Sequence, residues 1–414
     1  MLLALLLVSG CAGTLSQMSP PSNETSLVGH NGRRLSVDTF VSQYMREKQV
    51  SGVVVAIIHH NGPAEFHCFG VTDDKQRYPI TPQTLFALGS LSKGVTAEVV
   101  TMLVNEGRLH WNDTLQTLLP PGTVLSEDAR KITLLQLVTH TSGLPRQAMN
   151  MLSLEHLLAY LNNGENFYHE LDADGVLSYL SNFNAPLERE PSYSNLGFAI
   201  LGYLLKYQTG ESIETLASRM IFRPLAMGNT SFLPQTLHEY PWRALGHAGD
   251  QPKFKPRGAL TPDWQFMNNM VGAASLYSDA GDLINYARAH FAPTGQAALD
   301  QAFKDVSVDY YPRRVEAANI AWVTDTFGRQ RLTYQVGYIG GYSSYIGFDK
   351  ANQNAVVVLQ NSFNWSNYIG HAILQNRLSA PSVSHPLSGE QVNPCSGYDS
   401  VYQRPPLSER SSHL

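Results

Sequence analysis

The chain contains 414 residues, of which 43% are hydrophobic and 15% are charged, and its formal net charge is −5. This composition is typical of a folded globular protein and excludes an intrinsically disordered chain. Because the 29 basic and 34 acidic residues are spread thinly and form no block of one sign, we expect no nucleic-acid partner.

The first eleven residues, MLLALLLVSGC, combine a short apolar run with a cysteine. The run is too short to cross a bilayer and is typical of the apolar part of a signal peptide. Val8-Ser9-Gly10-Cys11 resembles a bacterial lipobox, in which the cysteine is lipidated, although no basic residue precedes the apolar run. We therefore expect a protein of the bacterial periplasm that contacts a membrane only through a lipid on Cys11. The alternative is an ordinary secretory signal or an apolar terminus.

Residues 12–36 are rich in Ser, Thr, Pro, Asn and Gly, which predicts a flexible linker. The next segment, SGVVVAIIHHNGPAEFHCFG over residues 51–70, predicts a β-hairpin around the turn Asn61-Gly62. A helical pattern follows over about residues 90–106, and Gly107 can serve as its C-cap.

Helical patterns broken by turns dominate the middle of the chain, for example over residues 153–162, where Ser153 can serve as the N-cap, and over 196–208. Near the C-terminus, SSYIGFDKANQNAVVVLQNS over residues 343–362 predicts a strand, a turn and a second strand. A last amphipathic stretch over residues 367–378 predicts a helix.

Strands at both ends of the folded region, with helices between them, predict an α/β (α+β) fold. We expect a central antiparallel sheet that is closed by strands from both ends and flanked by helices, with an inserted helical subdomain. The folded domain is predicted over residues 37–380, with an α/β part at about 37–90 and 265–380 and a helical part at about 91–264.

The C-terminal residues 381–414 are polar and rich in Pro and Ser, which predicts a disordered tail. Cys68 falls in a predicted strand and Cys395 in this tail, so we expect two free thiols. No cysteine or histidine spacing is typical of a metal site, and the neighbouring strand residues His59 and His60 face opposite ways. We therefore expect no metal and no cofactor.

The hexapeptide GSLSKG, residues 89–94, carries the first candidates for chemistry. Positions i and i+3 share a helix face, so Ser90 and Lys93 can touch if a helix begins at Ser90. A serine hydroxyl needs a nearby base and a site for the oxyanion, and a helix start offers free backbone N–H groups. Burial lowers the pKa of a lysine, so Lys93 could act as a base or proton relay. The alternative is a serine N-cap beside a solvated lysine.

The longer stretch TLFALGSLSKGVTAEVV resembles the nucleophile region of the serine β-lactamase and penicillin-binding-protein superfamily, most closely its class C β-lactamase branch. That branch also holds D-alanyl-D-alanine carboxypeptidases, D-aminopeptidases and family VIII esterases. Four further stretches agree in the same order: ITLLQLVTHTSGLPRQ, PSYSNLGFAILG, VGAASLYSDAGDLINYA and QVGYIGGYSSYIGFD. The resemblance covers about residues 37–380 and implies a β-lactamase/transpeptidase-like fold and a serine hydrolase that acts through an acyl-enzyme.

The resemblance also implies catalytic roles for individual residues. Ser90 corresponds to the nucleophile, and Lys93 moves protons together with Tyr193 of the Tyr-x-Asn motif. We expect the cation to lower the pKa of the tyrosine and make it a general base. The backbone N–H groups of Ser90 and Tyr338 correspond to the oxyanion hole. Considered alone, Tyr193 could equally be a core aromatic residue whose hydroxyl is satisfied.

Four residues correspond to substrate-binding positions. The resemblance implies that Asn195 orients the lysine and that Asn195 and Gln147 bind a substrate amide, whereas a turn and a solvated loop residue are the structural alternatives. Gln335 and Gly337 occupy the family's third motif on a predicted strand. His140, in THTSGLP, is expected to be structural.

The third motif departs from the family pattern, because Gln335-Val336-Gly337 stands where Lys-Thr-Gly or His-x-Gly is usual. The cation and hydroxyl that help to hold a substrate carboxylate are absent, and a neutral amide forms weaker hydrogen bonds. We therefore predict an exported serine hydrolase for a small-molecule or peptide ester or amide. One alternative is a β-lactamase or D-alanyl-D-alanine carboxypeptidase with another cation, for which Arg329 and Arg331 are close in sequence. The other is a non-catalytic cell-wall-binding lipoprotein.

Overall fold

The computed structural model describes residues 15–16, 34–75, 77–147, 154–168, 173–187, 190–267, 269–313, 316–365, 368–378 and 395. The expected signal peptide with Cys11, the expected N-cap Ser153 and nearly all of the expected C-terminal tail lie outside these residues. Within the described ranges, no helix has the length and apolar character that a membrane span requires.

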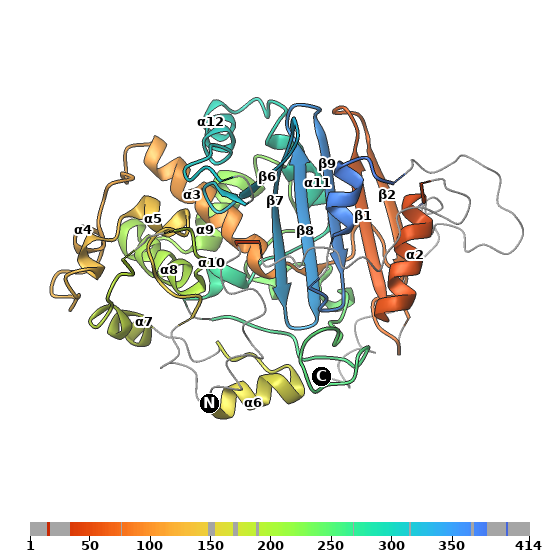
Figure 1. Ribbon diagram of the computed structural model, residues 1–414, viewed down its shortest axis with the longest axis horizontal. Helices are drawn as coiled ribbons and strands as arrows, with labels where there is room; N and C mark the ends of the chain where they lie inside the picture. The colour runs from red at the N-terminus through yellow and green to blue at the C-terminus, as the bar shows by residue number, and fades with distance from the viewer. Residues whose placement is uncertain are drawn as a thin grey trace, which may run out of the picture.

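An antiparallel sheet forms the centre of the molecule, with the strand order β2-β1-β9-β8-β7-β6-β5 (Figure 1). β1 and β9 pair antiparallel with Val53 opposite Gln360, so strands from the two ends of the domain lie side by side. This arrangement confirms the predicted sheet. Its strands are β1 (Gly52–Ile58), β2 (Ala64–Gly70), β5 (Ala317–Ala318), β6 (Val323–Phe327), β7 (Gln330–Ile339), β8 (Tyr342–Asp349) and β9 (Asn354–Gln360).

Local sequence explains the first hairpin. β1 reads GVVVAII and all of its residues are buried, as expected of a strand that is covered on both faces. The turn to β2 places His60 and Asn61 at φ values of 49° and 56°, which a tight hairpin turn requires and which Asn tolerates well. The predicted hairpin is therefore confirmed.

Helices cover both faces of this sheet. α2 (Val37–Lys48) and α13 (Ile369–Leu374) pack on one face, and α11 (Ala280–Ala289) packs on the other face against β1 and β9. α13 is shorter than the predicted helix over 367–378. The remaining helices of more than three residues are α3 (Ser92–Asn105), α4 (Leu115–Leu118), α5 (Leu134–Val138), α6 (Leu154–Asn163), α7 (Ala173–Leu180), α8 (Asn195–Thr209), α9 (Ile213–Ala217), the π-helical turn η4 (Ser218–Phe222), α10 (Val271–Ala274) and α12 (Ala297–Asp305).

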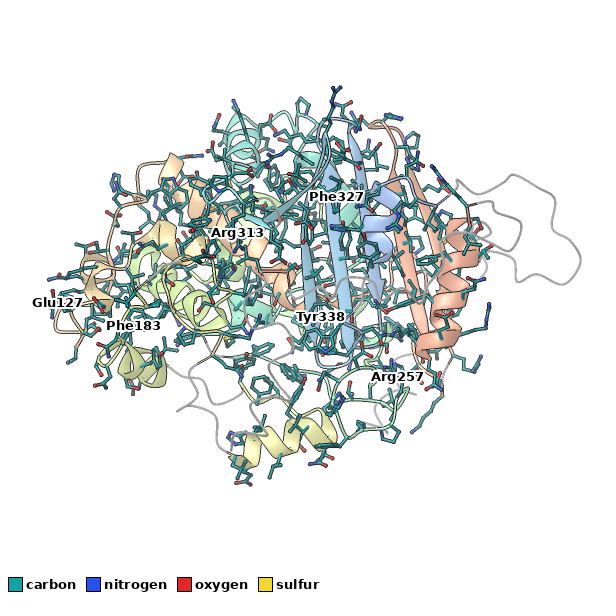
Figure 2. All side chains as sticks on the ribbon, in the orientation of Figure 1. Glu127, Phe183, Arg257, Arg313, Phe327 and Tyr338 are labelled. Atoms are coloured by element: carbon teal, nitrogen blue, oxygen red, sulfur yellow. A yellow bond between two sulfur atoms is a disulfide. The ribbon has the colours of Figure 1, made fainter. Side chains whose placement is uncertain are left out.

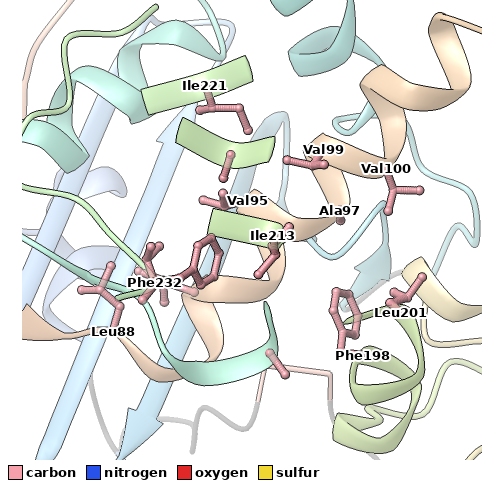
Figure 3. Close-up of a cluster of buried hydrophobic side chains, with 14 of the residues drawn as sticks. Leu88, Val95, Ala97, Val99, Val100, Phe198, Leu201, Ile213, Ile221 and Phe232 are labelled. Atoms are coloured by element: carbon pink, nitrogen blue, oxygen red, sulfur yellow. The ribbon is translucent and has the colours of Figure 1, made fainter. Parts of the chain in front are cut away.

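α3 is the central helix between the sheet and the helical subdomain. Its residues from Ser92 to Leu103 are all buried, which is typical of a helix that lies inside a core. Figure 3 shows Val95, Ala97 and Val99 of α3 among apolar side chains from α8, α9 and η4. The helix ends where predicted, because Gly107 follows it at φ 70°. Lys93 is thus carried on a helix that is fixed on all sides.

Residues 271–287, one of the stretches that carry the family resemblance, contain three short elements. They form α10, the short strand β4 (Tyr277–Ser278), which pairs with β3 (Phe86–Ala87), and then α11. The side chain of Asp279 accepts a hydrogen bond from the N–H of Asp282 at 2.8 Å and so caps a new helix. This cap fixes the start of α11.

Two residues of the expected flexible linker, Leu15 and Ser16, are buried against the domain. Their backbone N–H groups donate to the carboxylate of Glu316 at 3.0 and 3.2 Å, and the Leu15 side chain packs in the same core cluster as α2. The chain is therefore fixed to the domain at this point, because it meets both an apolar site and a carboxylate there.

Cys68 and Cys395 form a disulfide, so the prediction of two free thiols is wrong. Their Cα atoms lie 5.6 Å apart although 327 residues separate them along the chain. Cys68 is fully buried on β2, and Cys395 packs against the same apolar core. Spacing along the sequence does not reveal which cysteines pair.

Candidate active site

The candidate nucleophile lies in a short 3₁₀ turn, η1 (Gly89–Leu91), that joins β3 to α3. Gly89 has a φ of 54°, and a Cβ at this position would lie 3.0 Å from the Cβ of Ile339 on β7. The hydroxyl of Ser92 donates to the Gly89 carbonyl at 2.6 Å and accepts from the N–H of Leu276 at 3.0 Å. The turn that carries Ser90 is thus fixed against β7 and against the chain before β4.

The structure brings the three predicted catalytic residues into direct contact. Lys93 Nζ donates to Ser90 Oγ at 3.2 Å, and the hydroxyl of Tyr193 donates to the same oxygen at 2.6 Å. Lys93 Nζ also donates to the carbonyl of Ala273 at 2.8 Å, which holds the amine in place. The serine hydroxyl therefore has a possible proton acceptor and a possible proton donor within hydrogen-bonding distance.

The pKa of Lys93 shifts in the expected direction, whereas that of Tyr193 does not. Burial, with a smaller effect of the nearby Arg146, lowers the pKa of Lys93 well below its usual range, so the amine is available as a base. Burial also raises the pKa of Tyr193, and the hydrogen bond to Ser90 and the charge of Arg146 offset this only in part. The expectation of a lowered tyrosine pKa was wrong, because desolvation of the phenol outweighs the nearby charge.

His140 holds the segment that carries Tyr193. Its Nδ1 accepts a hydrogen bond from the N–H of Ser194 at 3.1 Å, its carbonyl accepts from Ser192 at 2.8 Å, and its ring lies 4.6 Å from the Tyr193 ring. Burial, reinforced by the charges of Lys93 and Arg146, lowers the pKa of His140 to about 3. A neutral His140 with an unprotonated Nδ1 fits the expected structural role.

Tyr338 lies near the end of β7, where Figure 2 labels it. β6 pairs with β7 only as far as Tyr334, and η1 packs against the part of the strand that follows. A Cβ on Gly89 would lie 3.1 Å from the Tyr338 carbonyl oxygen, so this carbonyl faces η1. Because the N–H and C=O of one strand residue point to the same edge, the Tyr338 N–H also faces η1. Its side chain lies elsewhere and donates to the carbonyl of Trp365 at 2.8 Å.

The side chains of the third motif alternate between the two faces of the sheet. Gln335 faces α3, is only 6% exposed, and donates through Nε2 to the carbonyl of Ala321 at 3.2 Å. It fills the space beside Gly94, where any Cβ would collide with its amide. Val336 packs on the opposite face among core residues of the α2 side. A hydroxyl at position 336 would therefore point away from Ser90.

Gly337 has a positioning role that the sequence did not indicate. A Cβ at this residue would collide with the carbonyl oxygen of Leu88 and with the hydroxyl of Ser344. The Ser344 hydroxyl donates to the same Leu88 carbonyl at 2.9 Å. The missing side chain thus allows the residue before η1 to lie directly on β7, which sets the distance between Ser90 and the strand.

Gln147 and Asn195, the two predicted amide-binding residues, are joined by a third side chain that sequence reasoning missed. Asn195 Nδ2 donates to the hydroxyl of Tyr168 at 2.9 Å, and this hydroxyl donates to Gln147 Oε1 at 2.7 Å. The hydrogen bonds that the described residues show for Lys93 go to Ser90 and Ala273, not to Asn195. Tyr168 belongs to no quoted motif, and the aromatic pair Phe167-Tyr168 was its only signal.

Arg146 is a second residue that sequence reasoning missed, although it stands next to Gln147 in a quoted motif. Its guanidinium carbon lies 4.7 Å from the centre of the Tyr193 ring, within the range of a cation–π contact. Arg331, considered earlier as a substitute cation, pairs instead with Asp309 at 2.7 Å at the opposite end of β7 from Tyr338. Arg329 is exposed in the turn before β7. Among these three arginines of the described residues, Arg146 is the one beside the catalytic set.

Comparison with known proteins identifies the family of the chain. The family model described as Beta-lactamase matches residues 37–378. A relative described as Beta-lactamase from Pseudomonas fluorescens is 25% identical over 382 residues, which cover 82% of this chain and 98% of the relative. The D-alanyl-D-alanine-carboxypeptidase/endopeptidase AmpH of Escherichia coli (strain K12) is 23% identical over 346 residues, which cover 79% of this chain and 83% of that protein.

Solved structures share the fold. The class C beta lactamase from Rhodobacter sphaeroides superposes with a TM-score of 0.69 at 20% identity, covering 82% of this chain and 98% of that chain. The Beta-Lactamase/D-Alanine Carboxypeptidase from Pseudomonas syringae gives a TM-score of 0.68 at 20% identity, with coverage of 82% and 97%. The predicted β-lactamase/transpeptidase-like fold is thereby confirmed. The chain belongs to the beta-lactamase family, whose members are serine hydrolases that transfer an acyl group from the enzyme to water.

Proposed function

We propose that this protein is an exported hydrolase that forms an acyl-enzyme on Ser90 with a neutral ester or amide. The observation that carries the proposal is the buried amide of Gln335, which is hydrogen-bonded to the Ala321 carbonyl on the face of β7 next to α3. A family member with lysine at this position would present a cation there. A substrate that needs no carboxylate recognition by β7 suits this site better.

The geometry supports a two-step acyl transfer. The neutral amine of Lys93 accepts the Ser90 proton while Ser90 Oγ attacks the substrate carbonyl, and the N–H groups of Ser90 and Tyr338 stabilise the oxyanion. Tyr193 then donates its proton to the leaving group and regains one from Lys93, which leaves the amine neutral and Ser90 acylated. In the second step Tyr193 accepts a proton from the attacking water and passes one to Lys93, which returns it to Ser90 Oγ. The acid is released and the Ser90 hydroxyl is restored.

A second candidate is a β-lactamase or a D-alanyl-D-alanine carboxypeptidase. Arg146 favours it, because its guanidinium lies beside Tyr193 and supplies positive charge from the loop side of the site. The names of the two relatives point to the same activities. The third alternative, a non-catalytic binding protein, fits poorly with a serine that contacts both a lysine and a tyrosine.

Activity-based labelling and a substrate panel test these candidates. Intact-mass spectra after treatment with a fluorophosphonate should show one adduct on the wild-type protein and none on Ser90→Ala. Turnover of p-nitrophenyl esters and D-amino-acid amides should then exceed turnover of a chromogenic cephalosporin. Efficient cephalosporin hydrolysis would favour the second candidate, and labelling that persists in Ser90→Ala would refute Ser90 as the nucleophile.

The disulfide between Cys68 and Cys395 supports export, because such bonds persist mainly in oxidising compartments such as the bacterial periplasm. We further propose that a lipid on Cys11 anchors the chain to a membrane. Metabolic labelling with a fatty-acid analogue should tag the wild type and not Cys11→Ser. Equal labelling of both proteins, or labelling of neither, would reject the anchor.

A further inference from the structure

The hydroxyl of Tyr168 lies between the two side chains that the family resemblance assigns to amide binding. It accepts a hydrogen bond from Asn195 Nδ2 at 2.9 Å and donates one to Gln147 Oε1 at 2.7 Å. Burial raises the pKa of Tyr168 to about 12, although Arg146 and Asn195 lower it in part. The phenol therefore keeps its proton at neutral pH and can donate and accept at the same time.

An aromatic cluster fixes this hydroxyl in place. The Tyr168 ring lies 4.3 Å from the ring of Phe167 and 6.3 Å from that of Trp264, and the residue is only 9% exposed. The indole N–H of Trp264 donates to the carbonyl of Gly164 at 2.7 Å, and the backbone N–H of Tyr168 donates to Asn166 Oδ1 at 2.9 Å. Packing against Phe167 and Trp264 thus fixes the ring, and the hydrogen bond to Asn166 fixes the backbone that carries it.

A secondary amide in a substrate has the same hydrogen-bonding capacity as this phenol. Its carbonyl accepts one bond and its N–H donates one, which are the two interactions that Asn195 Nδ2 and Gln147 Oε1 offer. In this site the Tyr168 hydroxyl already forms both of these hydrogen bonds. An acylamino group could bind there only by breaking two buried hydrogen bonds, whereas an acyl chain without an amide leaves them intact.

We propose that Tyr168 is a specificity-determining residue that occupies the acylamino position between Gln147 and Asn195. The enzyme then selects substrates whose acyl group carries no amide next to the scissile carbonyl, such as simple alkanoyl esters. This inference rests on the proposed acylation of Ser90 and names the acyl group that the site prefers. It concerns substrate recognition, because the Tyr168 hydroxyl is hydrogen-bonded to Gln147 and Asn195.

Two esters with matched chain length test the inference. p-Nitrophenyl pentanoate and p-nitrophenyl N-acetylglycinate have acyl chains of equal length, and only the second contains an amide. Tyr168→Phe keeps the ring and removes the hydroxyl, so kcat/KM for the acetylglycinate should rise roughly tenfold, about the worth of one net hydrogen bond. The value for the pentanoate should change less than twofold. Adding Gln147→Ala to Tyr168→Phe should remove the gain.

Tyr160→Phe is the matched control, because Tyr160 packs edge-on against Phe167 and Trp264 in the same cluster. It should leave the ratio of the two substrates unchanged. Equal changes for both esters in Tyr168→Phe would show that Tyr168 serves only packing, and would overturn the inference. So would a wild-type protein that already prefers the acetylglycinate.

Binding to Ser90→Ala separates this inference from the proposed function, because it requires no turnover. In that background, Tyr168→Phe should tighten the calorimetric Kd of N-acetylglycine p-nitroanilide roughly tenfold and leave that of the pentanoyl anilide unchanged. An unchanged Kd for the acetylglycine compound would refute the role of Tyr168 even if Ser90 is acylated. A lack of acylation in the wild type, together with a tightened Kd, would refute only the proposed function.

Discussion

The phenol of Tyr193 donates a hydrogen bond of 2.6 Å to Ser90 Oγ. Burial raises the pKa of this phenol and lowers that of Lys93, which favours a protonated tyrosine beside a neutral amine. In the proposed mechanism the first proton transfer therefore goes to Lys93, and Tyr193 makes the later transfer to the leaving group.

Replacing Arg146 should change the pH dependence of the reaction. Its positive charge lowers the pKa of Lys93, so Arg146→Met should raise this pKa toward the usual lysine value. Because only the neutral amine can accept the Ser90 proton, the fall of kcat/KM at acid pH should begin at a higher pH in the variant. Profiles for a neutral ester would measure the shift.

Arg331→Met is the matched control for that profile, because Arg331 pairs with Asp309 far from the catalytic set. Its curve should overlay that of the wild type. If Arg146→Met leaves the pH dependence of kcat/KM unchanged, or moves it to lower pH, the acid limb of the curve does not report the pKa of Lys93.

Gln335→Lys should improve the handling of anionic substrates. A charge-assisted hydrogen bond contributes about 1.5–3 kcal/mol, about twice a neutral one, and the gain of about 1–2 kcal/mol corresponds to roughly tenfold in rate. We expect that increase in kcat/KM for a cephalosporin and little change for a neutral ester. Val336→Thr should add nothing, because position 336 faces the other side of the sheet. Efficient cephalosporin turnover by the wild type, unimproved by Gln335→Lys, would instead point to Arg146 as the substrate's cationic partner.

Gly337→Ala should damage the site through the backbone. The added methyl group would collide with the carbonyl of Leu88, which cannot move without shifting η1 and Ser90. We expect a loss of about 1–3 kcal/mol in the free energy of unfolding, as for other overpacked interiors, and a larger fractional loss of acylation rate. Gly228→Ala is the control, because no atom lies within 4 Å of its added methyl group. Wild-type acylation in Gly337→Ala would show that the close approach of Leu88 is not required.

Removal of the disulfide should destabilise the domain. Cys395→Ser should lower the free energy of unfolding by about 2–5 kcal/mol, the usual cost of losing a native disulfide. Denaturant unfolding with and without reductant measures this loss, and the variant should no longer respond to reductant. Peptide mapping after alkylation should find Cys68 and Cys395 unmodified in the oxidised wild type. Alkylation of both thiols there would contradict the disulfide.

Much of the site could be predicted from sequence where the relevant contact is local or belongs to a motif. Ser90 and Lys93 are one helical turn apart, and the order of the five motifs placed Tyr193 and β7 near them. The fold followed in the same way from hairpin patterns at both ends of the domain.

The remaining features depend on contacts between distant parts of the chain. Tyr168 connects to Gln147 and Asn195 across 21 and 27 residues without any repeated pattern, and the disulfide spans 327. The pKa of Tyr193 was predicted with the wrong sign because the degree of burial is a property of the packed core. The degree of burial of a side chain cannot be read from the residue types next to it in the sequence.

The pairing of β1 with β9 also constrains the order in which the protein can form. During synthesis β1 leaves the ribosome about three hundred residues before β9, the strand it pairs with. Until β9 is made, the β1–β2 hairpin has one unpaired edge. A chain that stops before Asn354 would still contain Ser90, Lys93 and Tyr193. Without β9, however, β1 and β8 would each expose an unpaired inner edge, and such a fragment should aggregate instead of catalysing.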